Sequence, residues 1–150
     1  MTTSIENSLQ GVTRLFLDTA PVVYYVERNP TYFGRVRLIF EQIEIGALTA
    51  VTSPITLAEC LIHPYRLGLS QLQQDFFNVI VSAENTVFQP VNAQIGRQAA
   101  VLRASYNVTL TDALQVATAL VANCEAFLTN DLTLQRITEL RIVVLDPVEG

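Results

Sequence analysis

The sequence contains no lysine, one histidine and two cysteines, and these shortages exclude several kinds of chemistry. A Walker phosphate loop needs a lysine on the nucleotide phosphates, and a Schiff-base enzyme needs a lysine amine as its nucleophile. With His63 as the single histidine, a multi-histidine zinc site is impossible, and Cys60 and Cys124 form no paired metal motif. The Gly-x-Gly-x-x-Gly loop and the Gly-x-Ser-x-Gly elbow are also missing. The reactive groups that remain are carboxylates, hydroxyls and arginines.

Long apolar runs are missing as well. No run approaches the roughly 18 residues that a membrane span needs. The first residues also lack the basic and apolar blocks of a signal peptide. We therefore expect a cytoplasmic protein without membrane association. Cys60 and Cys124 lie in apolar surroundings, which favours reduced core thiols.

The composition is that of a globular protein, with 50% apolar and 15% charged residues in 150. This length fits one domain. The first dozen residues are mostly polar, so we predict a polar N-terminal tail over residues 1–13 and a single domain over 14–150.

Short apolar segments alternate with segments of helical periodicity. Helices are expected from Pro21 onward, from Ser53 onward, and over 32–46, 69–82, 92–106, 111–123 and 132–137; strands are expected over 14–17, 48–52, 86–89, 126–129 and 142–145. Because the strands are almost wholly apolar and helices separate them, the sequence predicts an α/β fold. Its form is a three-layer sandwich, with a central, mainly parallel sheet flanked by helices.

Four acids stand where an apolar segment begins or ends: Asp18, Glu59, Asp112 and Asp131. An acid beside a buried segment is costly unless it is capped, paired or bound to a metal. Asp18 follows the first strand and Asp131 follows the fourth, and ligands of parallel sheets collect at the carboxyl ends of the strands. Four such acids on separate elements therefore suggest one shared site.

Each acid alone also has a purely structural explanation. The spacings Thr109-x-x-Asp112 and Thr56-x-x-Glu59 match a capping box, and either Asn130 or Asp131 is placed to cap the short helix after it. His63 is more readily explained as ending its helix before Pro64 than as a catalytic base, because no serine or cysteine partner is evident. Capping does not, however, require one acid on each of four elements.

The formal charge of −5 does not favour attraction to nucleic acid. Two divalent cations held by the four acids would change the sum to −5 + 4 = −1, with positive charge where a phosphate would bind. The acidic composition is therefore compatible with a metal-dependent phosphodiester enzyme.

Four ordered segments carry a resemblance to a known family: Phe16-Leu17-Asp18-Thr19, Ser53-Pro54-Ile55-Thr56-Leu57-Ala58-Glu59, Thr111-Asp112-Ala113-Leu114-Gln115-Val116-Ala117-Thr118-Ala119 and Phe127-Leu128-Thr129-Asn130-Asp131. With these spacings, the chain resembles the PIN-domain family from about residue 14 to residue 147. The resemblance is to its short single-domain members, which are related to VapC-type toxins.

The resemblance implies hydrolysis of RNA phosphodiester bonds with Mg²⁺ or Mn²⁺, since hard cations prefer carboxylate oxygen. It implies that Asp18, Asp112 and Asp131 bind the metal directly or through water. Glu59 would be a further metal ligand or would orient the attacking water. Thr19 and Thr129 would support the carboxylates or a phosphate oxygen.

The resemblance also implies a homodimer and raises the prospect of an antitoxin protein as partner. Two positions depart from the family pattern. Leu134 stands where some members have a further acid, which would weaken a second metal site, and Leu132 stands where a basic residue is often found.

Two other phosphotransfer families also place a carboxylate after the first strand. Haloacid-dehalogenase-like phosphatases need a second aspartate where Ala20 stands, and both they and receiver domains use a lysine. A PIN-like module that binds RNA or protein without catalysis is the alternative from another class. The complete set of four mutually repelling acids argues against it.

Overall fold

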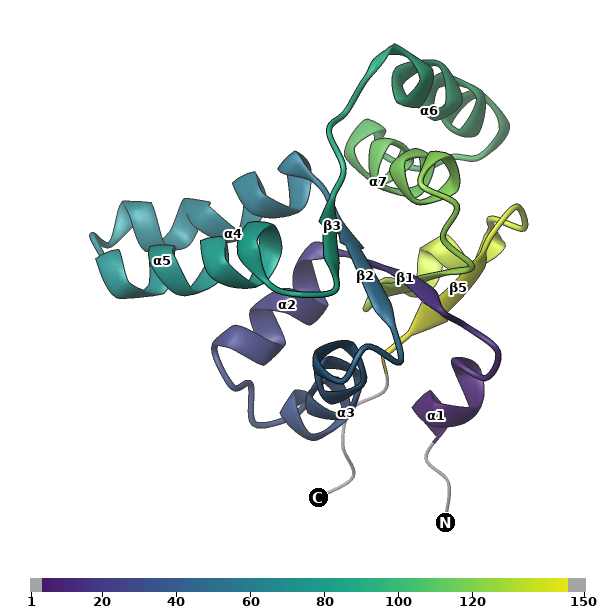
Figure 1. Cartoon of the computed structure of the whole chain (residues 1–150). Coiled ribbons are helices and arrows are strands. Elements are labelled where there is room, and N and C mark those ends of the chain that lie inside the picture. The colour runs from purple at the N-terminus through teal and green to yellow at the C-terminus, as the bar shows by residue number, and fades with distance from the viewer. Residues whose placement is uncertain (1–3, 146–150) are drawn as a thin grey trace.

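A five-stranded sheet forms the centre of the protein (Figure 1), whose computed structural model describes residues 4–145. The strands are β1 (Arg14–Leu17), β2 (Thr49–Thr52), β3 (Thr86–Phe88), β4 (Ala126–Thr129) and β5 (Arg141–Val144). Their order across the sheet is β3-β2-β1-β4-β5, and every neighbouring pair is parallel. The predicted α/β fold is confirmed, with a sheet that is parallel throughout.

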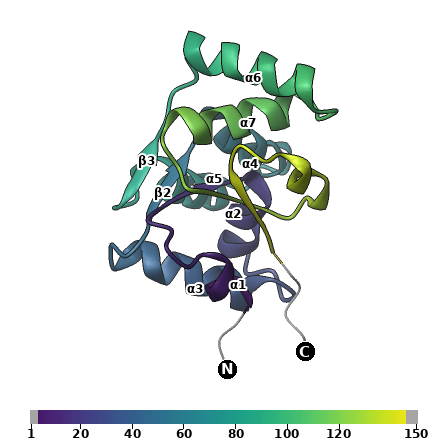
Figure 2. The ribbon, with the colours of Figure 1, turned by 90° about the vertical axis from the view of Figure 1, so that its right-hand side faces the viewer.

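Helices cover both faces of the sheet, as Figures 1 and 2 show. On one side lie α6 (Ala93–Ser105) and α7 (Leu110–Val121), packed against each other. On the other lie α1 (Ser4–Ser8), α2 (Thr19–Val26), α3 (Phe33–Glu44), α4 (Pro54–Arg66), α5 (Ser70–Phe77) and a π-helical turn, η1 (Asn78–Ser82). A 3-10 turn, η2 (Leu132–Arg136), joins β4 to β5.

The alternation of side chains along β1 assigns one core to each face. Leu15 and Leu17 are buried against the α1–α5 side, and Phe16 is buried against the α6–α7 side. On that second side, Phe16 stacks on Phe127 of the neighbouring strand, with ring centroids 5.1 Å apart. Burial on both faces explains why the strands are apolar at successive positions.

Local signals in the sequence set several helix ends. Gly46 follows α3 with φ +80°, a conformation that suits glycine. The Ser53 hydroxyl accepts hydrogen bonds from the N–H groups of Ile55 and Thr56, which caps α4 ahead of Pro54 in its first turn. These features agree with the predicted boundaries.

The expected end of α4 at His63 is wrong. The helix continues through Pro64 to Arg66, and the N–H groups of Leu67 and Leu69 bond to the carbonyls of His63 and Pro64. Pro64 is buried, so packing of its ring offsets the hydrogen bond that a proline cannot donate.

The polar tail predicted over residues 1–13 also needs correction within the described part of the chain. Residues 4–8 form α1, and Ile5 and Val12 are buried in the core beside α3. Isolated apolar residues in a polar stretch gave too weak a periodicity to predict this packing. Residues 1–3, and residues 146–150 of the predicted domain, lie outside the described residues. Within residues 4–145, no helix is long and apolar enough to cross a membrane.

Candidate active site

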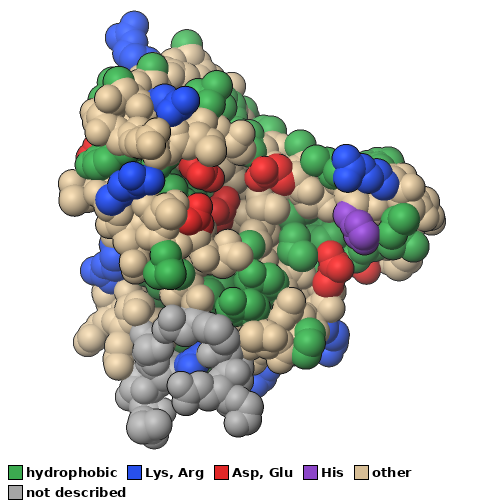
Figure 3. Space-filling view, turned by 180° about the vertical axis from the view of Figure 1, so that it is seen from behind, with side chains coloured by type: hydrophobic (Ala, Val, Ile, Leu, Met, Phe, Trp, Pro, Cys, Tyr) green, Lys and Arg blue, Asp and Glu red, His purple; other side chains and the backbone are tan. Residues whose placement is uncertain are grey.

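The order of the strands brings the four acids together. Asp18 follows β1 directly and Asp131 lies two residues beyond β4, and these two strands are parallel neighbours. Glu59 lies on α4, which follows β2 on the other side of β1, and Asp112 lies in the first turn of α7. All four line one hollow of about 380 Å³ at the carboxyl ends of the strands. Figure 3 shows acidic side chains gathered near the middle of this face.

Two hydroxyl groups hold acids of the hollow in place. Thr19 donates a hydrogen bond of 2.6 Å to Glu59 Oε1, which joins α2 to α4. Thr129 donates one of 2.8 Å to Asp18 Oδ2, which joins β4 to the end of β1. Thr129 is fully buried, so its hydroxyl holds the Asp18 carboxylate from the protein interior.

Two of the acids also take part in helix capping. The N–H of Asp112 bonds to the Thr109 hydroxyl, the capping residue of α7. Asp131 Oδ1 accepts bonds from the N–H and the hydroxyl of Thr133, which caps η2. Capping occupies only one oxygen of Asp131, so its other oxygen is available to a ligand.

Burial and mutual repulsion raise the pKa of two acids. Desolvation raises the pKa of Asp18 most strongly, and the charge of Asp112 raises it further, against the lowering effect of Thr129 and Gln115. Desolvation likewise raises the pKa of Asp112, with added repulsion from Asp131 and Glu59. The acids are thus close enough to disfavour one another's ionisation.

No basic side chain of the chain relieves this repulsion within residues 4–145. The ion pair found there joins Arg37 to Glu41, on the exposed surface of α3. The negative charge of the hollow is therefore left for a bound cation to neutralise.

The donor set fits Mg²⁺ or Mn²⁺, which prefer carboxylate oxygen. In residues 4–145, however, no three acids, cysteines or histidines are gathered closely enough to enclose an ion by themselves. Mg²⁺ usually keeps several of its waters and uses only one or two carboxylates directly. Carboxylates around an open hollow can therefore hold such an ion partly through water.

Sequence reasoning missed a layer of buried polar residues under Asp18. Gln115 on α7 donates from Nε2 to Thr56 Oγ1 at 2.8 Å and, over a longer 3.4 Å, to Asp18 Oδ1. Its amide oxygen accepts from the Ser53 hydroxyl. The one signal for this role in the sequence is an amide among the mostly apolar residues of a predicted helix.

Tyr24 and Asn130 form another part of the wall of the hollow. Asn130 Nδ2 donates a hydrogen bond of 2.7 Å to the Tyr24 phenol, and the ring of Tyr24 stacks on that of Tyr32 at 4.2 Å. The tyrosine is thereby held rigidly beside the acids.

The remaining candidate groups lie elsewhere. His63 is exposed on α4 and is not among the residues that line the hollow. Cys60 and Cys124 are free and buried, as predicted. Burial raises the pKa of the Cys124 thiol to about 12. Burial also raises the pKa of the Cys60 thiol, and the charges of Glu59 and Asp18 add to that effect. Neither thiol is therefore activated.

Comparison with solved structures finds the same fold in toxin–antitoxin systems. VapBC2 of Rickettsia felis, bound to a DNA fragment from its promoter, matches with a TM-score of 0.72 and 19% identity over 89% of this chain and 100% of that chain. VapBC-1 of nontypeable Haemophilus influenzae matches with a TM-score of 0.65 and 20% identity over 88% and 98%. VapC20 of Mycobacterium tuberculosis, a Sarcin-Ricin loop cleaving toxin, matches with a TM-score of 0.61 and 14% identity over 75% and 86%.

A search among curated proteins finds no match to this chain. The model of the PIN domain, in contrast, matches residues 15–140, a stretch that runs from the second residue of β1 past β4 and contains all four acids of the hollow. The sequence match and the shared fold agree with each other, and the chain belongs to the PIN domain family.

Proposed function

We propose that the protein is a ribonuclease that hydrolyses RNA phosphodiester bonds with Mg²⁺ or Mn²⁺ held by Asp18, Glu59, Asp112 and Asp131. The observation that carries this proposal is the arrangement of these acids. They come from four separate elements, line one hollow and have no basic partner among residues 4–145.

In this function, a bound cation supplies positive charge to the phosphate and makes a water molecule more acidic. The protein's own groups position the reaction. Thr129 and Gln115 orient Asp18, and Thr19 orients Glu59. Glu59 is the exposed acid of the set, which suits it to the attacking water rather than to the deepest part of the site.

The raised pKa values of Asp18 and Asp112 also have a consequence for binding. Without a cation, these carboxyl groups retain protons to a higher pH than ordinary aspartates do. Binding of a cation then releases protons, so we expect its affinity to increase with pH.

We further propose that the protein acts in the cytoplasm as the toxin of a toxin–antitoxin pair, and that it forms a homodimer. The fold shared with VapBC complexes supports an antitoxin partner, and the fold shared with VapC20 supports RNA as substrate. The alternative is a PIN-like module that binds RNA or protein without cleaving it. Retention of the complete acid set favours the enzyme.

Cleavage of single-stranded RNA by the purified chain tests this proposal. We expect cleavage with added Mg²⁺ or Mn²⁺, and none with a chelator or in Asp112→Asn. Asp75→Asn is the matched control, because Asp75 lies on α5, bonds to Gln71 and is not among the residues that line the hollow.

Folding of both variants is checked by circular dichroism and thermal unfolding. Asp112→Asn should be as stable as wild type or slightly more stable, because it removes a repelling charge. Equal cleavage by wild type and Asp112→Asn, or cleavage that survives the chelator, would contradict the assignment.

A further inference from the structure

The amide of Gln115 lies where three of the four acid-bearing elements meet. Its side chain is 1% exposed, although it is polar. It stands one helical turn after Asp112 on α7. It contacts Thr56 of α4, the helix that carries Glu59, and Ser53, the residue that caps this helix. It also reaches the Asp18 carboxylate at the end of β1.

The capping bonds of α4 fix the orientation of this amide. The Ser53 hydroxyl already accepts from the N–H groups of Ile55 and Thr56, so it has only its hydrogen to offer Gln115. The amide oxygen must therefore face Ser53, which turns the amide nitrogen toward Thr56 and Asp18. A carboxylate can only accept hydrogen bonds, so this orientation suits an ionised Asp18.

A second arm of the network reaches the backbone of β1. The Thr56 hydroxyl accepts from Gln115 and donates to the carbonyl of Leu17, the residue before Asp18, at 3.2 Å. Ser53, Thr56, Gln115 and Thr129 are all buried, so water does not compete for these bonds. The network holds both the side chain of Asp18 and the strand end that carries it.

We propose that Gln115 is a positioning residue of the cation site, which holds the Asp18 carboxylate in place relative to Asp112 and Glu59. This inference rests on the proposed function. Hydrogen-bond partners behind a metal ligand commonly change metal affinity or activity by about 10–100-fold when they are removed. We expect an effect of that size for Gln115, although it need not touch the cation or the RNA.

The test compares Mn²⁺ affinity, measured on the full chain by electron paramagnetic resonance of free Mn²⁺, in Gln115→Met and Thr118→Val. Methionine keeps the shape of glutamine but makes none of its hydrogen bonds. Thr118 is the matched control: it is buried on the same helix, and its hydroxyl donates to the carbonyl of Leu114, within the helix and away from Asp18. We expect Mn²⁺ affinity about 10–100-fold lower in Gln115→Met and unchanged in Thr118→Val.

RNA cleavage by the same proteins gives a second readout. At saturating Mn²⁺, kcat of Gln115→Met should recover toward that of wild type, while KM for RNA should stay close to its wild-type value. If Gln115 only stabilised the fold, Gln115→Met would lower the melting temperature and leave the Mn²⁺ affinity unchanged.

A second pair of variants covers a failure of Gln115→Met to fold. Thr56→Val should weaken Mn²⁺ binding in the same direction, and Thr56→Ser, which keeps the hydroxyl, should restore it. Wild-type Mn²⁺ affinity in Gln115→Met or in Thr56→Val would overturn the inference while leaving the ribonuclease proposal intact. A wild-type protein that neither binds Mn²⁺ nor cleaves RNA would overturn both.

Discussion

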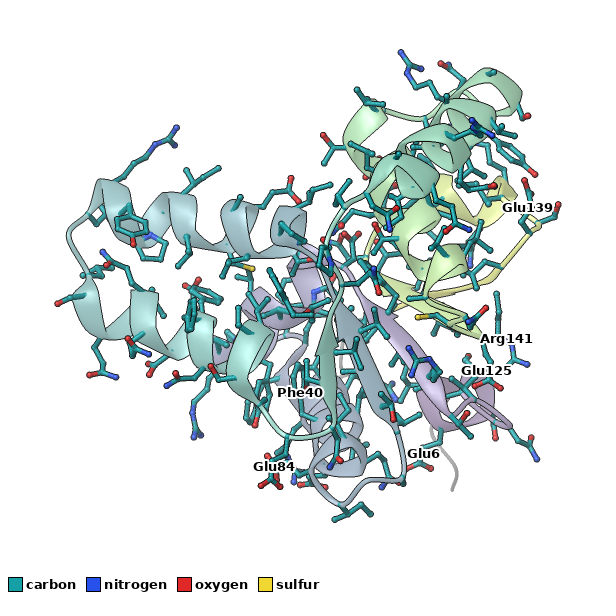
Figure 4. The ribbon with its side chains drawn as sticks, turned by 45° about the horizontal axis from the view of Figure 1, so that its top comes forward. Glu6, Phe40, Glu84, Glu125, Glu139 and Arg141 are labelled. Carbon is teal, nitrogen blue, oxygen red and sulfur yellow. The ribbon has the colours of Figure 1, made fainter. Side chains whose placement is uncertain are left out.

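Acids at the two ends of the sheet have pKa values shifted in opposite directions. At the amino end, Glu125 precedes β4, and its Oε1 accepts bonds from the N–H and hydroxyl of Thr13 and from the N–H of Arg14. These bonds lower the pKa of Glu125, and so does the charge of Arg141, whose side chain lies near that of Glu125 (Figure 4). At the carboxyl end, the pKa values of Asp18 and Asp112 are raised.

The difference separates an acid that serves the fold from the acids that we propose bind a cation. Glu125 joins the starts of β1 and β4 and has donors for its charge within the protein. The acids of the hollow lie close to one another and have no basic partner in residues 4–145, and all of them except Glu59 are partly buried. If these acids served stability alone, replacing them by neutral residues would make the fold more stable.

The largest expected effect is on cleavage. Asp18→Asn should reduce kcat on RNA at least about 100-fold, the upper range for a residue that merely supports a metal ligand. Glu125→Gln should cleave at the wild-type rate, although it also loses an acid. The kcat of both variants is measured at saturating Mn²⁺. An equal fall in kcat in the two variants would contradict the view that only the acids at the carboxyl end of the sheet take part in cleavage.

Mn²⁺ should stabilise the protein only through the acids at the carboxyl ends of the strands. At about 100 times its dissociation constant, Mn²⁺ should raise the free energy of unfolding by about 2.7 kcal/mol. Glu125→Gln should show the same gain, and Asp112→Asn a smaller one. Urea unfolding with and without Mn²⁺ provides the measurement, and a full gain in Asp112→Asn would contradict the prediction.

Hydroxyl groups at the two ends should differ in their contribution to stability. Thr129→Val removes the buried donor to Asp18 and the acceptor for the N–H of Asp131, so it should lower the free energy of unfolding by about 1–3 kcal/mol. Thr13→Val removes an exposed donor to Glu125, and the loss should be smaller. Thr129→Ser, which keeps the hydroxyl, should unfold like wild type in urea; a loss as large as that of Thr129→Val would show that the hydroxyl is not responsible.

The smallest expected effect is on the pH dependence of stability without metal. Raised pKa values of Asp18 and Asp112 mean that the native state keeps protons that the unfolded chain loses. Their contribution to the free energy of unfolding is therefore complete below their ordinary pKa of 3.8 and is lost as the pH rises through the raised values.

The lowered pKa of Glu125 acts in the opposite direction. Its contribution is complete above the ordinary pKa of 4.5 and is lost as the pH falls through the lowered value. The free energy of unfolding is measured with urea across the acidic pH range. In the double variant Asp18→Asn with Asp112→Asn, its decrease at rising pH should disappear. In Glu125→Gln, the loss at falling pH should be reduced. If the pH dependence of the free energy of unfolding were the same in these variants as in wild type, the raised pKa values of Asp18 and Asp112 and the lowered pKa of Glu125 would be contradicted.

Sequence reasoning could predict the fold because most elements carry a local signal. The apolar strands, the glycine after α3 and the serine cap of α4 all depend on residues near in sequence. It could not predict that the helix expected over 69–82 ends as a π-helical turn, η1, after α5. The same apolar period fits both kinds of helix, and only tertiary packing decides between them.

The grouping of the four acids follows from strand order, which the sequence does not state directly. Their placement after β1 and β4 and near the start of α7 suggested a common edge, and they line one hollow. Their roles in metal binding and catalysis stay predictions. Gln115 was missed because its importance depends on Ser53, 62 residues earlier, which no local pattern connects to it.

The central place of β1 has a consequence for biosynthesis. One of its neighbours, β2, is made soon afterwards, but the other, β4, pairs with it across a long stretch of sequence, Leu15 opposite Ala126. Such long-range pairing forms late and slowly. While a ribosome is still translating the stretch before β4, the emerging part lacks Asp131 and one wall of the hollow, so the proposed nuclease is assembled only after residue 131 has been made.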